Sequence, residues 1–254
     1  MTGTNDLAGK VAVITGAARG LGRAIALDLA RAGADIGIGL RDITRDHGLA
    51  AEIVALGRRA LPLAMDVTDL AGSRDAINRV AEEFGAVDIL VNNAGGGMLD
   101  EAIDVTEADF DEVWSLNTKS TFFISQHAAK YMREHGGGVI INVASQAGLI
   151  ALPRESAYCI SKAAVIHMTK CLAVEWGEWG IRVNAVAPTF IETDGTADAL
   201  ADPVFRADTI GRIAALHRIG KPTEVSGAVT FIASPAASLI TGHTLVIDGG
   251  WTAR

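Results

Sequence analysis

Residues 10–31, "KVAVITGAARGLGRAIALDLAR", predict a strand, a glycine-rich turn and a helix. The stretch opens with a short apolar, β-rich run and closes with the periodicity of a helix. Between them, Gly16, Gly20 and Gly22 have the spacing GxxxGxG. Glycines at such a turn let the backbone approach a pyrophosphate, and the N-terminus of the following helix stabilises its negative charge. The alternative is a strand-to-helix turn whose glycines serve only close packing.

The same alternation of strand and helix continues along the chain. Apolar runs predict strands at 10–15, 35–40, 60–65, 88–92, 138–144, 181–187 and 244–248, and helical patterns span 20–32, 44–57, 69–84, 107–135, 156–179 and 223–233. Nearly continuous apolar runs indicate strands that are covered on both faces, and the helices supply the crossovers between parallel strands. The sequence therefore predicts an α/β fold of Rossmann type, with a doubly wound, parallel, seven-stranded sheet and helices on both faces.

Composition narrows the function classes. The 254 residues include 49% hydrophobic residues, enough for a core, and no linker or repeat divides them, so we expect a single domain over 1–254. The net charge of −8 argues against nucleic acid or an anionic membrane as a partner. We find no signal peptide or membrane span and expect a cytoplasmic protein. The spacing of Cys159 and Cys171 and of the six His predicts neither a disulfide nor a metal site.

Two regions lie outside this simple alternation. The segment 189–217 lacks a strand and mixes charged residues with Ala and Gly, which predicts a helical lid over the substrate. The long helices at 107–135 and 156–179 carry more small and apolar residues than one buried face requires. We expect this surplus to form a subunit interface.

The end of the second predicted strand bears on the cofactor. In a dinucleotide-binding fold, an acid at this point favours a free ribose 2′-OH, whereas an arginine favours a 2′-phosphate. Arg41 comes first, and Arg19 in the glycine turn is a second cation. If Asp42 rather than Arg41 faces the ribose, the preference reverses. The sequence thus favours NADP over NAD.

Tyr158 and Lys162 stand four residues apart in "SAYCISKAAV" (156–165) and share one helix face. A cation about 4 Å from a phenol supplies about 4 kcal/mol, which is what a tyrosine needs to act near neutral pH. The alternative is a packed Tyr beside a Lys that reaches solvent. Ser145 and the stretch "VNNAG" (91–95) end strands at the same sheet edge, and Asn117 lies inside a long helix. These companions favour a catalytic site.

The whole set closely resembles the short-chain dehydrogenase/reductase family over essentially the full chain. The resemblance runs from "TGAARGLG" through "NNAG", Asn117, Ser145 and Tyr158-x-x-x-Lys162 to "VNAVAP" and the C-terminal "IDGG". It implies that Tyr158 is the general acid/base, that Lys162 lowers its pKa and binds the nicotinamide ribose, and that Ser145 polarises the substrate carbonyl or alcohol. It also implies that Asn117 holds a water linking Lys162 to solvent.

The resemblance further implies a homotetramer and a set of cofactor-binding residues. Besides Tyr158 and Lys162, these residues are Gly16, Arg19, Gly20, Leu21, Gly22, Arg41, Asp66, Val67, Asn93, Ala94, Gly95, Pro188, Ile191 and Thr193. Thr189 departs from the family pattern, because many members have Gly after the proline.

Substrate choice depends on the residues beside Ser145 and Tyr158. The candidates are Gly97, Gln146, Arg154 and Glu155, together with the predicted lid. The polarity of Gln146, Arg154 and Glu155 suits a sugar, a sugar acid or a polyol. The alternative is that these residues form a solvated rim.

Two other functions stay open. The chain also resembles 3-oxoacyl-[acyl-carrier-protein] reductases in "RGLGRAIA", "VDILVNNAG" and "APTFIETD", and an acyl-CoA thioester would suit the same chemistry. Glu178 and Trp179 stand where a cation would attract an acidic carrier protein, so we rank this reading second. A non-catalytic, cofactor-sensing scaffold is the third reading, and the presence of Ser145, Tyr158 and Lys162 argues against it.

Overall fold

Within residues 6–253, seven strands form one parallel sheet in the order β3-β2-β1-β4-β5-β6-β7. The computed structural model of the protein describes residues 6–253. The strands are β1 (Val11–Thr15), β2 (Asp35–Leu40), β3 (Ala60–Ala64), β4 (Ile89–Asn92), β5 (Gly138–Val143), β6 (Ile181–Pro188) and β7 (Thr244–Ile247). The predicted doubly wound sheet is confirmed, and all seven predicted strands are present.

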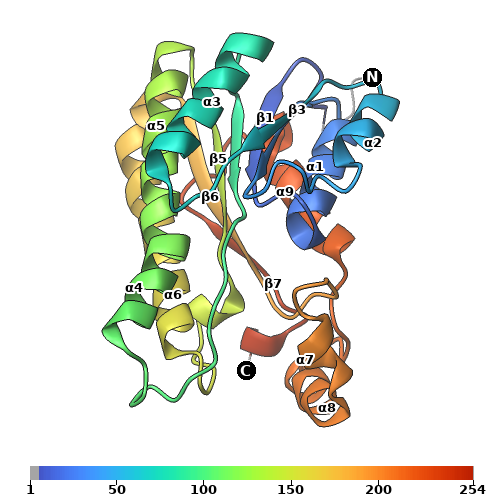
Figure 1. Cartoon of the computed structure of the whole chain (residues 1–254), viewed down its shortest axis with the longest axis vertical. Coiled ribbons are helices and arrows are strands. Elements are labelled where there is room, and N and C mark those ends of the chain that lie inside the picture. Colours follow the sequence, from blue (N-terminus) through green and yellow to red (C-terminus); the bar gives the residue numbers. More distant parts are fainter. Residues whose placement is uncertain (1–5, 254) are drawn as a thin grey trace.

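Helices cover both faces of the sheet (Figure 1). One face packs against α1 (Gly20–Arg31), α2 (Leu49–Ala55) and α9 (Pro222–Ala233). The other packs against α3 (Leu70–Phe84), α5 (Ser120–Glu134) and α6 (Ser156–Trp176). Each face has its own apolar cluster, which explains why the strand sequences are apolar at almost every position. Within residues 6–253, no helix has both the length and the apolar character that crossing a membrane requires.

Two predicted helices differ from the observed ones. The helix predicted at 107–135 is divided into α4 (Glu107–Trp114) and α5 by a π-helical turn at Ser115–Lys119. The helix predicted at 44–57 begins only at Leu49, because the carboxylates of Asp42 and Asp46 accept the backbone N–H groups of Thr44 and Gly48. Such local hydrogen bonds compete with helix formation.

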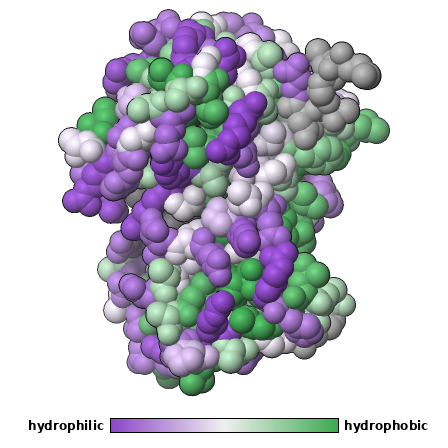
Figure 2. All heavy atoms as spheres, turned by 90° about the vertical axis from the view of Figure 1, so that its right-hand side faces the viewer, coloured by the Kyte–Doolittle hydropathy of each residue, from purple (hydrophilic) through white to green (hydrophobic). Residues whose placement is uncertain are grey.

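The segment 189–217 is helical, as predicted, and contains α7 (Ala197–Ala201) and α8 (Pro203–Arg212). Figure 2 shows hydrophobic surface near the lower end of the molecule, where this segment lies. Phe190 contacts Phe205 at 5.5 Å between ring centroids and stacks on Trp251 at 5.9 Å. These rings join the segment to the short helical turn at Trp251–Ala253 near the C-terminus.

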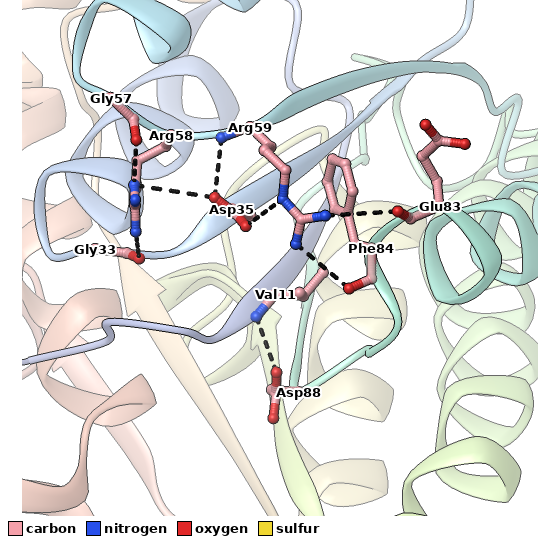
Figure 3. A network of polar contacts seen from close by, with 9 residues as sticks. All are labelled: Val11, Gly33, Asp35, Gly57, Arg58, Arg59, Glu83, Phe84 and Asp88. Carbon is pink, nitrogen blue, oxygen red and sulfur yellow. Dashed lines mark hydrogen bonds and ion pairs between the residues drawn. The ribbon is translucent and has the colours of Figure 1, made fainter.

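A polar network joins β2, β3 and α3 at the amino edge of the sheet (Figure 3). Asp35 accepts hydrogen bonds from the backbone N–H of Arg59 at 2.9 Å and from its Nε at 2.7 Å. The guanidinium of Arg59 lies 4.3 Å from the ring centroid of Phe84 at the end of α3. Asp88 accepts the backbone N–H of Val11 at 2.9 Å, which ties β1 to the start of β4. This network lies away from the opposite, carboxyl edge of the sheet, where doubly wound folds bind their ligands.

Candidate active site

The candidate site lies at the carboxyl edge of the sheet, where the strand order reverses between β1 and β4 (Figure 1). In doubly wound folds this switch point forms the ligand crevice. The glycine turn follows β1, "NNAG" follows β4, Ser145 follows β5, and Pro188 is the last residue of β6. The fold therefore brings the predicted motifs to one edge.

The glycine turn is held by Asn93. The side-chain Nδ2 of Asn93 donates to the backbone oxygens of Thr15 at 2.9 Å and Gly16 at 3.1 Å. A Cβ added at Gly22 would lie only 2.6 Å from this Nδ2, so a larger residue cannot replace Gly22 without displacing Asn93. Asn93, which we predicted as a cofactor contact, thus shapes the turn through its side chain.

Thr15 is a residue that the sequence analysis missed. Its Oγ1 accepts the backbone N–H groups of Asn93 at 3.0 Å and Ala94 at 2.9 Å, and so joins the end of β1 to the loop after β4. A threonine that ends a strand gives no pattern of its own, because its partners are far away in the sequence. Only the pairing of β1 with β4 makes the contact visible.

The residues around the turn fit the pyrophosphate of a dinucleotide. Gly16 and Gly20 have φ values of 65° and 57°, which glycine adopts without strain. Arg19, the N-cap of α1, makes no side-chain capping hydrogen bond, so the N–H groups of the first helical turn have no side-chain acceptor. Thr193 lies against the turn, since a Cβ added at Gly20 would be 3.4 Å from its Cβ. The positive end of α1 therefore faces this cradle.

Arg41 and Asp42, which directly follow β2, differ in their hydrogen-bond and ion-pair partners. The Asp42 carboxylate accepts from the Thr44 hydroxyl at 2.6 Å and lies 3.2 Å from Nε of Arg45. The hydrogen bonds from Thr44 lower the pKa of Asp42, with a further contribution from Arg45. Asp42 is thus engaged within its own turn. Arg41 is exposed beside it.

Asp66 and Val67 follow β3 at the same edge. Asp66 accepts from the Thr68 hydroxyl at 2.7 Å, and the hydrogen bonds from Thr68 lower the pKa of Asp66, with the charge of Arg41 adding to the effect. Val67 is buried. Arg41 and Asp66 therefore lie close enough to interact electrostatically across the ends of β2 and β3.

Asn117 lies in the π-helical turn between α4 and α5 and is 1% exposed. Its Oδ1 accepts the backbone N–H of Gly96 at 3.0 Å, and its Nδ2 donates to the Gly96 oxygen at 2.8 Å and to Oγ of Ser161 at 2.9 Å. The side chain thus ties the glycine loop after β4 to α6. The predicted water-holding role of Asn117 stays a prediction.

The loop Gly95–Gly97 lies close against Lys162 and Tyr158. A Cβ added at Gly95 would lie 3.1 Å from Nζ of Lys162, and one at Gly97 would lie 3.0 Å from the ring of Tyr158. Ser161, which could not be found from the sequence, accepts from Asn117 Nδ2 and donates to the Tyr158 backbone oxygen at 2.7 Å. The three glycines therefore let the loop close over α6.

The protonation of Tyr158 differs from the prediction. Burial raises the pKa of Tyr158 to about 12; a hydrogen bond with Ser145 opposes this rise, and the negative charge of Glu155 adds to it. Lys162 is 5% exposed, and its Nζ donates to the Val143 oxygen at 2.8 Å. Burial lowers the pKa of Lys162 to about 8. The expected lowering of the Tyr158 pKa by Lys162 is therefore wrong for this structure, because desolvation dominates both groups and Nζ lies 5.7 Å from the phenol ring centroid.

Ser145 is the N-cap of a short helical turn at Gln146–Gly148, and its Oγ accepts the backbone N–H of Ala147 at 3.1 Å. The side chain is 8% exposed. Because Ser145 lies two residues beyond the end of β5 and its hydroxyl also meets Tyr158, a substrate oxygen could bind between the two hydroxyl groups.

The four predicted substrate residues differ in their surroundings. Gly97 contacts Tyr158, as described above, and Gln146 is 1% exposed. Arg154 is exposed on the rim, where its Nε lies 3.7 Å from the Glu101 carboxylate. Glu155 is partly buried, and burial raises its pKa. A backbone bridge between Asp100 and Glu155 joins the two loops that border the site.

The remaining predicted cofactor residues lie around the crevice. Leu21 packs at the start of α1, Ala94 lies beside Gly16, and Ile191 is buried and bridges to Gly220. Among residues 6–253, no group of His, Cys, Asp and Glu side chains is arranged to hold a metal ion. The site offers hydrogen-bonding and proton-transfer groups together with a phosphate cradle.

Comparisons with known proteins agree with this geometry. The family model described as "Enoyl-(Acyl carrier protein) reductase" matches residues 16–252. The chain is 42% identical to the 2-dehydro-3-deoxy-D-gluconate 5-dehydrogenase of Escherichia coli (strain K12), covering 98% of both chains. It is 41% identical to the D-threitol dehydrogenase of Mycolicibacterium smegmatis, covering 98% of this chain and 95% of that protein.

A solved structure gives the same result. The gluconate 5-dehydrogenase from Burkholderia cenocepacia J2315, in complex with NADP and tartrate, superposes with a TM-score of 0.95 at 34% identity. The match covers 100% of this chain and 99% of that one. Fold, site geometry and similarity over the full length lead to one conclusion: the chain belongs to the short-chain dehydrogenase/reductase family.

Proposed function

We propose that the protein is an NAD(P)-dependent dehydrogenase that interconverts a secondary alcohol and a ketone on a polyol, a sugar or a sugar acid. The observation that carries the proposal is the meeting of Ser145, Tyr158 and Lys162 beside the Gly95–Gly97 loop at the carboxyl edge. The names of the relatives from E. coli and M. smegmatis, which specify a sugar-acid derivative and a tetritol, support the substrate class.

The chemistry that a nicotinamide ring supplies when bound is transfer of a hydride to or from the substrate carbon. In the reducing direction, Ser145 donates a hydrogen bond to the carbonyl oxygen, and Tyr158 transfers its phenolic proton to that oxygen. In the oxidising direction, the Tyr158 phenolate takes the hydroxyl proton. Lys162 lies under the Gly95 backbone, where it can hold the nicotinamide ribose.

NADP is the proposed cofactor. The glycine turn and the first turn of α1 would hold the pyrophosphate, and Arg41 and Arg19 would supply positive charge for a 2′-phosphate. Asp42, the residue that would favour NAD, already has Thr44 and Arg45 as partners. The NADP in the B. cenocepacia structure supports this choice.

Parallel titrations with NADPH and NADH test the cofactor proposal. We expect tighter binding of NADPH, and Arg41→Ala should weaken NADPH binding about 10- to 100-fold while changing NADH binding little. Arg74→Ala, at an exposed position on α3, is the matched control and should leave both affinities unchanged. Tighter binding of NADH by the unmodified protein would show that NADP is the wrong cofactor.

The carrier-linked reductase is the competing function. The ends of α5 and α6 carry exposed Glu134, Glu175 and Glu178, and the guanidinium of Arg133 lies over the ring of Trp179 at 4.5 Å. Lys130 and Arg133 are also exposed at this end of α5, so the edge has mixed charge and lacks the net positive patch that would attract an acidic carrier protein. Efficient reduction of a 3-oxoacyl thioester, without turnover of any polyol or sugar, would replace our substrate class with this one.

We further propose a homotetramer that uses the face of α5 and α6. A groove of about 610 Å³ lies between these helices and is lined by apolar side chains, including Trp114, Phe122, Met168, Leu172, Trp176 and Trp179. Val174, also on α6, is 84% exposed. An apolar groove of this kind suits the same face of a second copy, because a two-fold interface pairs identical surfaces.

The segment 189–217 is proposed as the substrate lid. Thr193 connects the segment to the glycine turn, and Phe190, Phe205 and Trp251 join it to the C-terminal turn, so its movement would open or cover the crevice. Substrate-induced protection of 189–217 in hydrogen exchange would support the lid, and unchanged exchange would contradict it.

The cytoplasm is the proposed location. Cys159 and Cys171 are both free thiols, which suits a reducing compartment.

A further inference from the structure

Asn142 on β5 and Thr169 on α6 form a buried pair that joins these two elements. Nδ2 of Asn142 donates to Oγ1 of Thr169 at 2.9 Å, and both residues are 0% exposed. Oδ1 of Asn142 accepts from Nδ2 of Asn92, on the neighbouring strand β4, at 2.9 Å. Thr169 donates to the backbone oxygen of Val165 at 2.8 Å. The proton transfer proposed above uses none of these side chains.

The same two elements carry the reacting groups. Ser145 follows Asn142 by three residues, and Tyr158 precedes Thr169 by eleven residues on α6, which is about three helical turns. The hydroxyl groups of Ser145 and Tyr158 meet at the carboxyl edge. Polar contacts thus tie α6 to β5 and its following turn at two levels. A shift of α6 along its axis that stretched the buried pair would also move Tyr158 relative to Ser145.

The other contacts of α6 between these two levels fix its position less well. Val165 and Ile166 share an apolar cluster with Ala144, and apolar packing has no preferred direction. A hydrogen bond, in contrast, holds its two heavy atoms within about 2.7–3.2 Å of each other. Lys162 also donates to the Val143 oxygen at 2.8 Å, but its amine is proposed to hold the nicotinamide ribose as well. The buried pair is therefore a directional contact that the reaction leaves undisturbed.

We propose that Asn142 and Thr169 are positioning residues that set the place of α6 against β5, so that the hydroxyl groups of Tyr158 and Ser145 meet. Buried polar groups often stabilise a fold no more than apolar groups of similar size, but they can fix the register of packed elements. Misplacing reacting groups by about 1 Å can cost about 100-fold in rate. The inference rests on the proposed dehydrogenase function and deepens it.

Thr169→Val tests the buried pair, because it keeps the shape of the side chain and removes the hydroxyl group. Turnover is measured with NADP⁺ for the best substrate in a panel that includes D-threitol, glycerol and D-gluconate. We expect kcat to fall about 10- to 100-fold, with KM and NADPH affinity changed by less than about threefold. Thr169→Ser keeps the hydroxyl group and should restore most of kcat.

Thr230→Val, on α9, is the matched control. Thr230 is also buried, and its hydroxyl donates to the backbone oxygen of Ser226, four residues earlier, at 3.0 Å. This variant therefore loses the same kind of bond within a helix, but on the other face of the sheet. It should keep the kcat of the unmodified enzyme.

Fluorine NMR follows the surroundings of Tyr158 without turnover. The chain has two tyrosines, so labelling with fluorotyrosine gives two signals, and Tyr158→Phe identifies the signal of Tyr158. We expect this signal to move in Thr169→Val and to stay in place in Thr169→Ser and Thr230→Val.

An unchanged kcat or an unchanged Tyr158 signal in Thr169→Val would overturn the inference, and so would equal losses in Thr169→Val and Thr169→Ser. If Thr169→Val does not fold, Thr169→Ala is compared with Thr169→Ser, and equal kcat values in these two would overturn it. Failure of both Thr169→Val and Thr169→Ala to fold would mean that the buried pair is structural, which also overturns it. A moved signal in a protein that turns over no polyol, sugar or sugar acid would instead support the positioning role and refute the proposed function.

Discussion

Tyr158 and Lys162 are both shifted toward their neutral forms by burial. The pKa of Tyr158 is raised to about 12, and the pKa of Lys162 is lowered to about 8. Near neutral pH the phenol keeps its proton, which is the state that a carbonyl reduction needs. Alcohol oxidation needs the phenolate, whose population is small until the pH is strongly alkaline.

A pH profile tests this difference between alcohol oxidation and carbonyl reduction. Between about pH 6 and 7.5, where Lys162 with its pKa of about 8 is still mostly protonated, kcat/KM for alcohol oxidation should rise close to tenfold per pH unit, because the fraction of Tyr158 phenolate grows at that rate below a pKa of about 12. Carbonyl reduction should stay nearly constant over the same range. Both directions are measured by the absorbance of reduced nicotinamide in one buffer series. An oxidation rate independent of pH would contradict the assignment of Tyr158 as its base.

At the scale of single residues, the sequence predicts the reacting groups but not the residues whose contacts hold the site in place. Ser145, Tyr158 and Lys162 could be found because strand ends and helix spacing place them at one edge. Thr15, Ser161 and the buried pair of Asn142 and Thr169 could not, because each matters through contacts that only folding creates. The pKa of Tyr158 was predicted with the wrong sign, since spacing gives the distance to a cation but not the loss of water.

At the scale of elements, strand positions could be predicted better than helix boundaries. Each strand is a continuous apolar run, which burial on both faces requires. The π-helical turn at Ser115–Lys119 interrupts a pattern that reads as one helix, and its extra residue turns Asn117 toward Gly96 and Ser161. Such a turn depends on tertiary partners and leaves no local signal.

The Asp35–Arg59 contact gives a prediction for the amino edge. Burial alone would raise the pKa of Asp35, but the hydrogen bonds and charge of Arg59 hold it below its usual value. The contact therefore stabilises the fold above the unfolded-state pKa of Asp and is lost as the pH falls. Asp35→Asn should lower the free energy of unfolding by about 1–2 kcal/mol near neutral pH and by less in acid.

Urea unfolding of Asp35→Asn at neutral and acidic pH measures this loss. The control is Asp111→Asn at an exposed position on α4, which should unfold like the unmodified protein. Turnover by folded Asp35→Asn should be unchanged, because Asp35 begins β2 and the site lies at the opposite, carboxyl ends of the strands. Equal destabilisation at both pH values would show that the charge of Asp35 contributes nothing.

At the scale of the whole molecule, the two edges of the sheet have different tasks. The amino edge carries the network of Asp35, Arg59 and Asp88, and the carboxyl edge carries the glycine turn and Tyr158. The third region is the outer face of α5 and α6, which carries the apolar groove. From the sequence, only an excess of apolar residues in these helices could be predicted.

Light scattering tests whether this face joins subunits. Cys171 is exposed and lines the groove, so Cys171→Glu should be tolerated by a single chain but should place unpaired charges in a two-fold interface. We expect a tetramer for the unmodified protein and a smaller species for Cys171→Glu. Val54→Glu, on the exposed side of α2, is the control and should remain a tetramer. A monomeric unmodified protein at micromolar concentration would refute the assembly.

The proposed function depends on proton transfer by Tyr158 during the NAD(P)-dependent oxidation of a polyol or sugar. The most direct measurement compares the unmodified enzyme with Tyr158→Phe in steady-state turnover over a panel of polyols and sugars, with NADPH binding measured in parallel. We expect turnover by the unmodified enzyme, a loss of at least about a thousandfold in Tyr158→Phe, and NADPH affinity changed by less than about threefold. Turnover that survives in Tyr158→Phe would show that Tyr158 does not transfer the proton.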